Sequence, residues 1–115
     1  MAVKVNTVDI LQKYFSGVVK RADHHAPFVN NIIYSLLGII VLKKDPGTDI
    51  EVRGNHEDET GNILWVTING SRYALRYEHN TGEIEIRKDT YNGPIMLNIN
   101  NKTTAQDILA AAEKF

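Results

Sequence analysis

The chain has 115 residues, no cysteine, and 13 basic against 14 acidic residues, which gives a net charge of -1. This length suits one domain, and we expect residues 1–115 to form a single α+β domain. Without cysteine the chain has no disulfides, thiolate metal ligands or thiol nucleophiles, and its charge excludes a global field that would attract nucleic acid or anionic membranes. The composition fits a cytoplasmic protein, and we predict no cofactor.

No segment is predicted to enter a membrane. The longest apolar run, residues 32–42, is shorter than the roughly 20 residues that cross a bilayer. The N-terminus lacks the apolar segment of a secretion signal. We therefore expect neither export nor a membrane partner.

The first helix is predicted over residues 8–22. Asn6 or Thr7 is placed to accept hydrogen bonds from its first amides. One helical face carries the apolar residues Val8, Leu11, Phe15, Val18 and Ala22.

A second helix is predicted to begin at Pro27, because proline suits the first helical position. Gly38 is expected to end this helix, since residues 39–42 are mostly β-branched and favour a strand. The turn residues at 43–47 would close that strand. Residues 50–53 alternate and could pair back across the same turn.

Four better strands follow a polar loop at 54–62, and they are expected near residues 63–68, 71–79, 83–88 and 94–99. Asn69-Gly70 predicts a two-residue type I′ hairpin turn. The resulting cross-strand pairs are Val66 with Tyr73, Leu64 with Leu75, Tyr77 with Ile84, Leu75 with Ile86, and Arg76 with Glu85. Apolar residues meet apolar residues in this register, which supports an antiparallel meander.

Ile95, Leu97 and Ile99 are expected to continue the buried face of the sheet. A last helix is then predicted after Thr103 or Thr104, with Gln106 completing a capping box to Thr103. The whole pattern predicts an α+β fold with two N-terminal helices, an antiparallel β-meander of four to six strands and a C-terminal helix. The helices are expected chiefly on one sheet face.

The opposite sheet face combines arginines, glutamates and one tryptophan. Alternation assigns to it Trp65, Thr67, Arg72, Ala74, Arg76, Glu83, Glu85, Arg87, Met96 and Asn98, with Glu51 and Arg53 as further candidates. Trp65 would expose a large apolar surface there unless a helix or a second subunit covered it. We therefore predict a homo-oligomer, a dimer or larger, with Trp65, Met96 and Arg76 at its interface.

An alternative function for the same face is nucleic-acid binding, with contacts from Arg53, Arg72, Arg76 and Arg87. The neighbouring glutamates and the absence of a basic field do not favour it, because ion pairs across a solvated face explain these charges equally well.

A small enzyme or metal protein is a further alternative, centred on the histidines at positions 24, 25, 56 and 79. His24, His25 and His79 are candidate ligand contacts. However, their spacing matches no metal-binding motif, and the chain contains no complete catalytic motif. We predict no catalytic residue and no metal site, and the sequence identifies no small-molecule ligand.

Several segments resemble a known family. They are Asn6-Thr7-Val8-Asp9-Ile10, Gln12-Lys13-Tyr14-Phe15, His24-His25-Ala26-Pro27, and Leu64-Trp65-Val66 before Ile68-Asn69-Gly70. With these segments the chain resembles the small bacterial proteins encoded on mobile integron gene cassettes. The resemblance implies an accessory role, a cytoplasmic location and frequent oligomerisation, and it transfers no catalytic residue.

Overall fold

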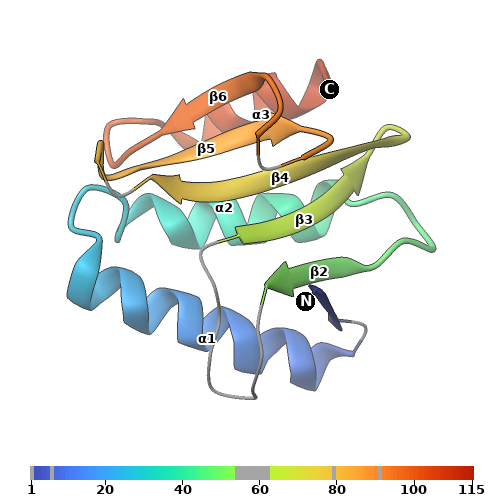
Figure 1. Cartoon of the computed structure of the whole chain (residues 1–115), viewed down its shortest axis with the longest axis horizontal. Coiled ribbons are helices and arrows are strands. Elements are labelled where there is room, and N and C mark those ends of the chain that lie inside the picture. Colours follow the sequence, from blue (N-terminus) through green and yellow to red (C-terminus); the bar gives the residue numbers. More distant parts are fainter. Residues whose placement is uncertain (1, 6, 54–62, 79, 91) are drawn as a thin grey trace.

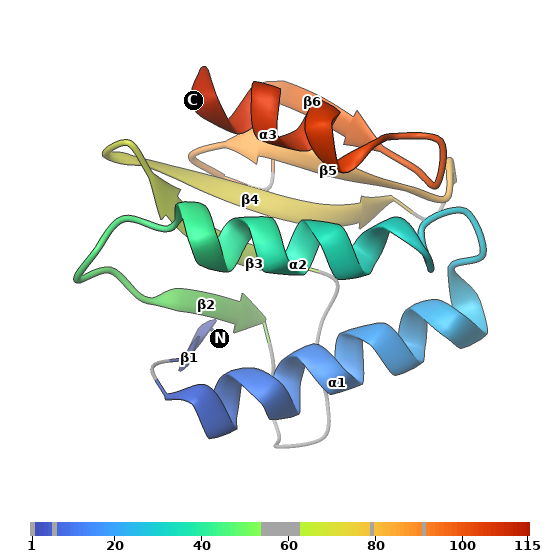
Figure 2. The same cartoon turned by 180° about the vertical axis from the view of Figure 1, so that it is seen from behind.

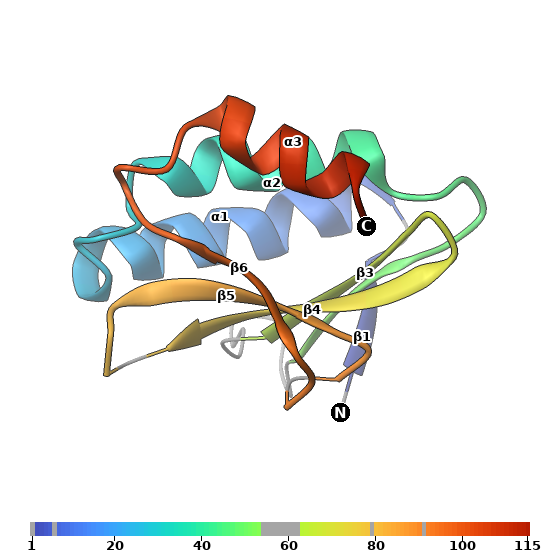
Figure 3. The same cartoon turned by 90° about the horizontal axis from the view of Figure 1, so that it is seen from above.

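The computed structural model describes residues 2–5, 7–53, 63–78, 80–90 and 92–115. These residues form one antiparallel sheet whose six strands lie in chain order, with three helices on the same face (Figure 1 and Figure 3). The strands are β1 (Ala2–Val5), β2 (Ile50–Arg53), β3 (Ile63–Ile68), β4 (Ser71–Glu78), β5 (Glu83–Lys88) and β6 (Ile95–Ile99). The helices are α1 (Val8–His25), α2 (Ile32–Lys43) and α3 (Ala105–Glu113). The predicted α+β fold is therefore confirmed.

The meander from β3 to β5 has the predicted register. All five expected cross-strand pairs are present, including Arg76 opposite Glu85. Asn69 and Gly70 have φ values of 53° and 81°, as a type I′ turn requires. The Asp45 carboxylate accepts hydrogen bonds from both of their amides, at 2.9 and 2.7 Å, and so fixes the turn.

β2 pairs with β1 on one side and β3 on the other. The prediction that it pairs back across the turn at 43–47 is wrong, because residues 39–42 belong to a helix. β1 was not predicted, since four residues are too few to establish an alternating pattern. The loop predicted at 54–62 lies outside the described residues.

α1 begins where the sequence predicts, and Thr7 Oγ1 accepts a hydrogen bond from the Ile10 amide. The helix continues to His25, three residues beyond the predicted end.

α2 begins at Ile32 instead of Pro27. Its first turn receives a cap from a distant part of the chain, because Asn101 Oδ1 accepts from the amides of Asn31 and Ile32 at 3.0 and 3.1 Å. Asn101 Nδ2 in turn donates to the Pro27 carbonyl at 3.0 Å. The start of this helix therefore depends on a contact made across some 70 residues of sequence.

The strand predicted at 39–42 is also wrong, because α2 runs through Gly38 to Lys43. Ile39 and Ile40 are buried among the core residues together with Leu36. Their burial in the layer between helices and sheet outweighs the modest helix propensity of β-branched residues.

α3 is capped by Thr104, one of the two capping residues that the sequence predicts. Thr104 Oγ1 accepts from the Asp107 amide at 3.0 Å, and the Thr104 amide donates to Asp107 Oδ2 at 3.1 Å. The capping box is thus Thr104–Asp107 and not Thr103–Gln106.

The core lies between the sheet and the helix layer. Tyr73, Leu36, Ile99, Ile108, Val29 and Val66 are its largest fully buried side chains. At one end Tyr73 stacks on Phe115 with a centroid distance of 4.2 Å. Within the described part of the chain, no helix has the length and apolar character needed to cross a membrane.

Candidate interaction surface

The candidate surface is the sheet face opposite the helices, which we call the outer face. Antiparallel pairing aligns its side chains in rows that cross the strands. One row contains Glu51, Trp65, Ala74 and Arg87, and the next contains Ile63, Arg76, Glu85 and Asn98. Since α1, α2 and α3 all lie on the other side of the sheet, none of them covers these rows (Figure 3). The alternative that a helix covers Trp65 is therefore excluded.

Trp65 is half-buried and is held by two residues of neighbouring strands. The Arg72 guanidinium lies 5.0 Å from the centroid of the indole ring, within cation–π range. Arg72 Nη2 also forms an ion pair with Glu51 Oε1 at 3.1 Å. Glu51 and Arg72 therefore meet across β3, with the Arg72 guanidinium over the indole ring.

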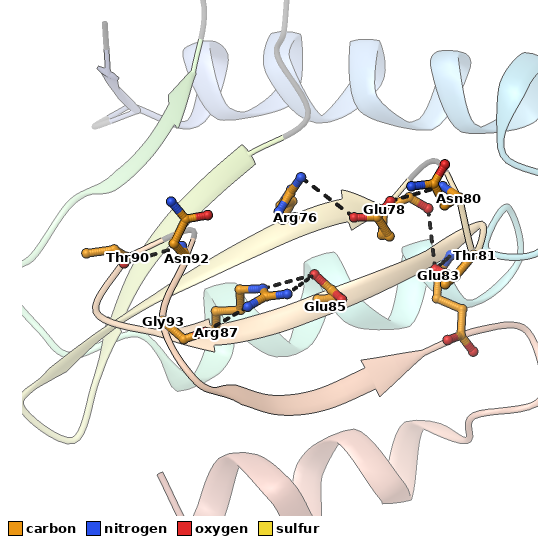
Figure 4. Close-up of polar contacts among 10 residues, drawn as sticks. All are labelled: Arg76, Glu78, Asn80, Thr81, Glu83, Glu85, Arg87, Thr90, Asn92 and Gly93. Atoms are coloured by element: carbon orange, nitrogen blue, oxygen red, sulfur yellow. Dashed lines mark hydrogen bonds and ion pairs between the residues drawn. The ribbon is translucent and has the colours of Figure 1, made fainter.

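Arg87 contacts both a neighbouring carboxylate and a backbone carbonyl (Figure 4). Its Nε and Nη2 lie 2.9 Å from Glu85 Oε1, and its Nη1 donates to the Gly93 carbonyl at 2.8 Å. Glu85 is buried, with only 7% of its surface exposed, and the approach of two guanidinium nitrogens to one of its carboxylate oxygens provides the partner its charge requires. Arg87 thus joins β5 to the loop that leads into β6.

Arg76 is the cross-strand partner of Glu85 and forms an ion pair with Glu78 at 3.6 Å (Figure 4). The ion pairs of Arg76 and Arg87 therefore connect residues two apart on the same strand, whereas that of Arg72 crosses a strand. As a result, each of these three arginines has a carboxylate beside it.

Two buried apolar residues lie among the charged side chains of the outer face. Ala74 is fully buried between its cross-strand partners Trp65 and Arg87, and Ile63 is buried beside Arg76. Ile63 was missed as a member of the outer face, although its two-residue spacing from Trp65 is the signal that would have identified it.

At β6 the predicted alternation fails. Ile86 pairs with Leu97 but Arg87 pairs with Ile95, so Met96 is the extra residue of a β-bulge. Ile95, which was expected in the core, is consequently 45% exposed, and Met96 is exposed beside it. Three strand spacings separate β6 from β3, so Met96 and Trp65 lie on the order of 14 Å apart.

The other candidate contact residues that the sequence predicts are not brought together within the described part of the structure. Arg53 is exposed at the end of β2, and His24 is exposed in the last turn of α1. The side chain of His25 and the whole of His79 lie outside what the structure describes. Among the described residues, no group of three or more histidines and carboxylates is placed to hold a metal ion.

The fold and this surface define the chain as an α+β protein with an open sheet, one of whose faces carries paired charges around a single tryptophan. The chain belongs to the integron cassette protein VCH_CASS1 family, whose model matches residues 11–109. The match covers α1 through most of α3 and confirms the resemblance inferred from the sequence. A search of curated proteins finds no match to the chain.

Proposed function

We propose that this protein is a non-enzymatic interaction protein that acts as a homo-oligomer, with the outer face in contact with a second subunit. The observation that carries the proposal is that Trp65 lies on the sheet face opposite its core neighbours Leu64 and Val66, and that none of the three described helices covers this face. Membership of the integron cassette family supports an accessory role. We further propose that the protein acts in the bacterial cytoplasm, which a chain without cysteine suits.

The composition of the outer face supports a protein contact. Trp65 and Arg72 are residue types enriched at interface centres, and their mutual contact lowers the conformational entropy that binding would otherwise cost. The exposed apolar residues Ile95 and Met96 add a second contact region at the β6 edge. Ala74 and Arg87 lie between these two regions in the register of the sheet, and Arg76 lies in the adjacent row with its charge balanced by Glu78.

The same ion pairs argue against nucleic-acid binding. Arg72, Arg76 and Arg87 each lie within 4 Å of a carboxylate, so they present little net positive charge to a phosphate backbone. Salt-dependent binding of random DNA or RNA would favour the nucleic-acid alternative over the homo-oligomer.

The test is Trp65→Glu, measured by light scattering after gel filtration together with far-UV circular dichroism. The variant should have a lower mass than the wild type and an unchanged spectrum, because Trp65 is not part of the core between sheet and helices. Lys102→Glu, at an exposed position in the loop before α3, serves as the matched control and should retain the wild-type mass. A wild type that is monomeric at every accessible concentration would refute the proposal.

A further inference from the structure

The opposite side of the molecule has an exposed apolar surface of its own. It is formed by α2, which runs between α3 and α1 in the helix layer (Figure 2). Tyr34 and Leu42 are 60% and 75% exposed, and Val41 is exposed next to Leu42. We call Tyr34, Gly38, Val41 and Leu42 the α2 ridge; these positions recur at the spacing of one helix face.

Gly38 is the unusual member of the α2 ridge. A glycine inside a helix is destabilising relative to alanine, and it is usually explained by a neighbour that leaves no room for a side chain. Here a Cβ added to Gly38 would meet nothing within 4 Å, and the residue has no positive φ. The contacts of the described residues therefore give no reason for glycine at this position, whereas the close approach of another helix would.

Two large members of the ridge flank this glycine at equal distances along the helix. Tyr34 lies four residues before Gly38 and Leu42 lies four residues after it, so two large side chains flank a gap on the same face. If two such helices pack antiparallel with their Gly38 residues at the crossing point, Tyr34 of each helix meets Leu42 of the other. This is the reciprocal contact that a twofold dimer requires.

We propose that α2 pairs antiparallel with α2 of a second copy of the chain, about a twofold axis at Gly38. The helix layer forms one of the two broad faces of a molecule whose extents are 33 × 31 × 24 Å. α2 has 12 residues and is about 18 Å long, so a contact that buries roughly 800 Å² on each partner must also include the exposed surfaces of α1 and α3 beside it.

The surroundings of the ridge complete this interface. A shallow groove between α1 and α2 is lined by Phe15, Val19, Tyr34 and Leu37, and it offers space for apolar side chains of the partner. Lys20 and Asp23 border the groove and supply a polar rim. This contact is independent of the proposed function, because it uses the face of the molecule opposite to Trp65.

The main test compares the solution masses of the wild type, Gly38→Leu and Leu42→Glu. Both variants should fold, since Leu42 is exposed and the added leucine enters open space. Each should show half the mass of the parent protein, with an unchanged far-UV spectrum. Asn92→Glu, at an exposed position in the loop between β5 and β6, should leave the mass unchanged.

The solution mass of Leu42→Glu, measured in both the wild-type and the Trp65→Glu backgrounds, distinguishes the α2 contact from a contact through the outer face. A halved mass in each background supports the α2 contact, whatever Trp65→Glu does alone. A monomeric wild type, or variants at positions 38 and 42 that keep the parent mass, would overturn the proposal. A monomer would mean that the ridge meets a different partner.

Cross-linking tests the register, because the natural chain has no cysteine to compete. Gly38→Cys should form a disulfide dimer under mild oxidation. Tyr34→Cys alone should not, since eight residues of helix place two copies of this position about 12 Å apart. When the Tyr34→Cys and Leu42→Cys variants are mixed, they should form a disulfide dimer that contains one copy of each. Dimers of Tyr34→Cys alone, without the mixed product, would overturn the antiparallel register.

Discussion

Asn101 determines where α2 begins. Its side-chain oxygen accepts from two amides of the first helical turn, and its amide group donates to the carbonyl of Pro27 and to Asn30 Oδ1. No residue next to α2 provides this cap, because Asn31 forms no capping hydrogen bond of its own. The loop between β6 and α3 therefore stabilises a helix formed much earlier in the chain.

We expect Asn101→Ala to lower the free energy of unfolding by about 2 kcal/mol, since it removes a helix cap and leaves the amides of Asn31 and Ile32 without their acceptor. Urea denaturation followed by circular dichroism measures the change. Lys102→Ala, at the exposed neighbouring position, should be close to neutral. An Asn101→Ala midpoint equal to that of the wild type would show that the cap is dispensable.

Gly70 is constrained in a different way, by its backbone. Its φ of 81° is unfavourable for alanine even though a methyl group would have space. Gly70→Ala should therefore cost about 1 kcal/mol or more, observed as a lower melting temperature. Asn80→Ala, at an exposed position in the next turn, should have a smaller effect. A Gly70→Ala protein that melts with the wild type would contradict the turn assignment.

Among the elements, the strands of the meander were predictable and the boundaries of α2 were not. Alternation and the Asn69-Gly70 turn are local signals, so β3 to β5 follow from the sequence with their register. The ends of α2 instead depend on Asn101 and on burial of Ile39 and Ile40, which are tertiary effects. A β-branched run has no periodicity that separates a buried strand from a buried helix.

The assignment of the N-terminal cap of α3 can be tested by substitution. Thr104→Ala removes the acceptor for the Asp107 amide and should destabilise the protein by about 1 kcal/mol. Gln106→Ala should be nearly neutral, although the sequence made Gln106 an equally good capping residue. Thermal unfolding of the two variants distinguishes the assignments, and the reverse order of stabilities would support the capping box at Thr103.

At the scale of the whole molecule, the sequence located the outer face but not its details. Trp65 and the arginines lie on that face, as alternation predicted, because the period of a strand is fixed by its backbone. The carboxylate partner of each arginine could not be predicted, since a long side chain can reach several neighbouring carboxylates. The bulge at Met96 could not be predicted either, because one extra residue leaves no mark in an alternating pattern.

We also expect the purified protein to contain no stoichiometric metal ion. A chelator should then leave the melting temperature unchanged, because a metal bound only to the folded state would stabilise it by mass action. Elemental analysis after gel filtration, combined with a melting curve in the chelator, makes this measurement. One equivalent of zinc that stays with the protein would instead favour a role for His24, His25 or His79.

The bulge at Met96 also affects how the sheet can grow. β6 is an edge strand, and a straight edge of free amides and carbonyls would accept a strand from another molecule and start a fibre. Here the edge is five residues long, begins directly after Pro94, and has its hydrogen-bond spacing interrupted at Met96. Strand addition at β6 is therefore disfavoured, so the exposed Ile95 and Met96 can be retained without making this edge a template for aggregation.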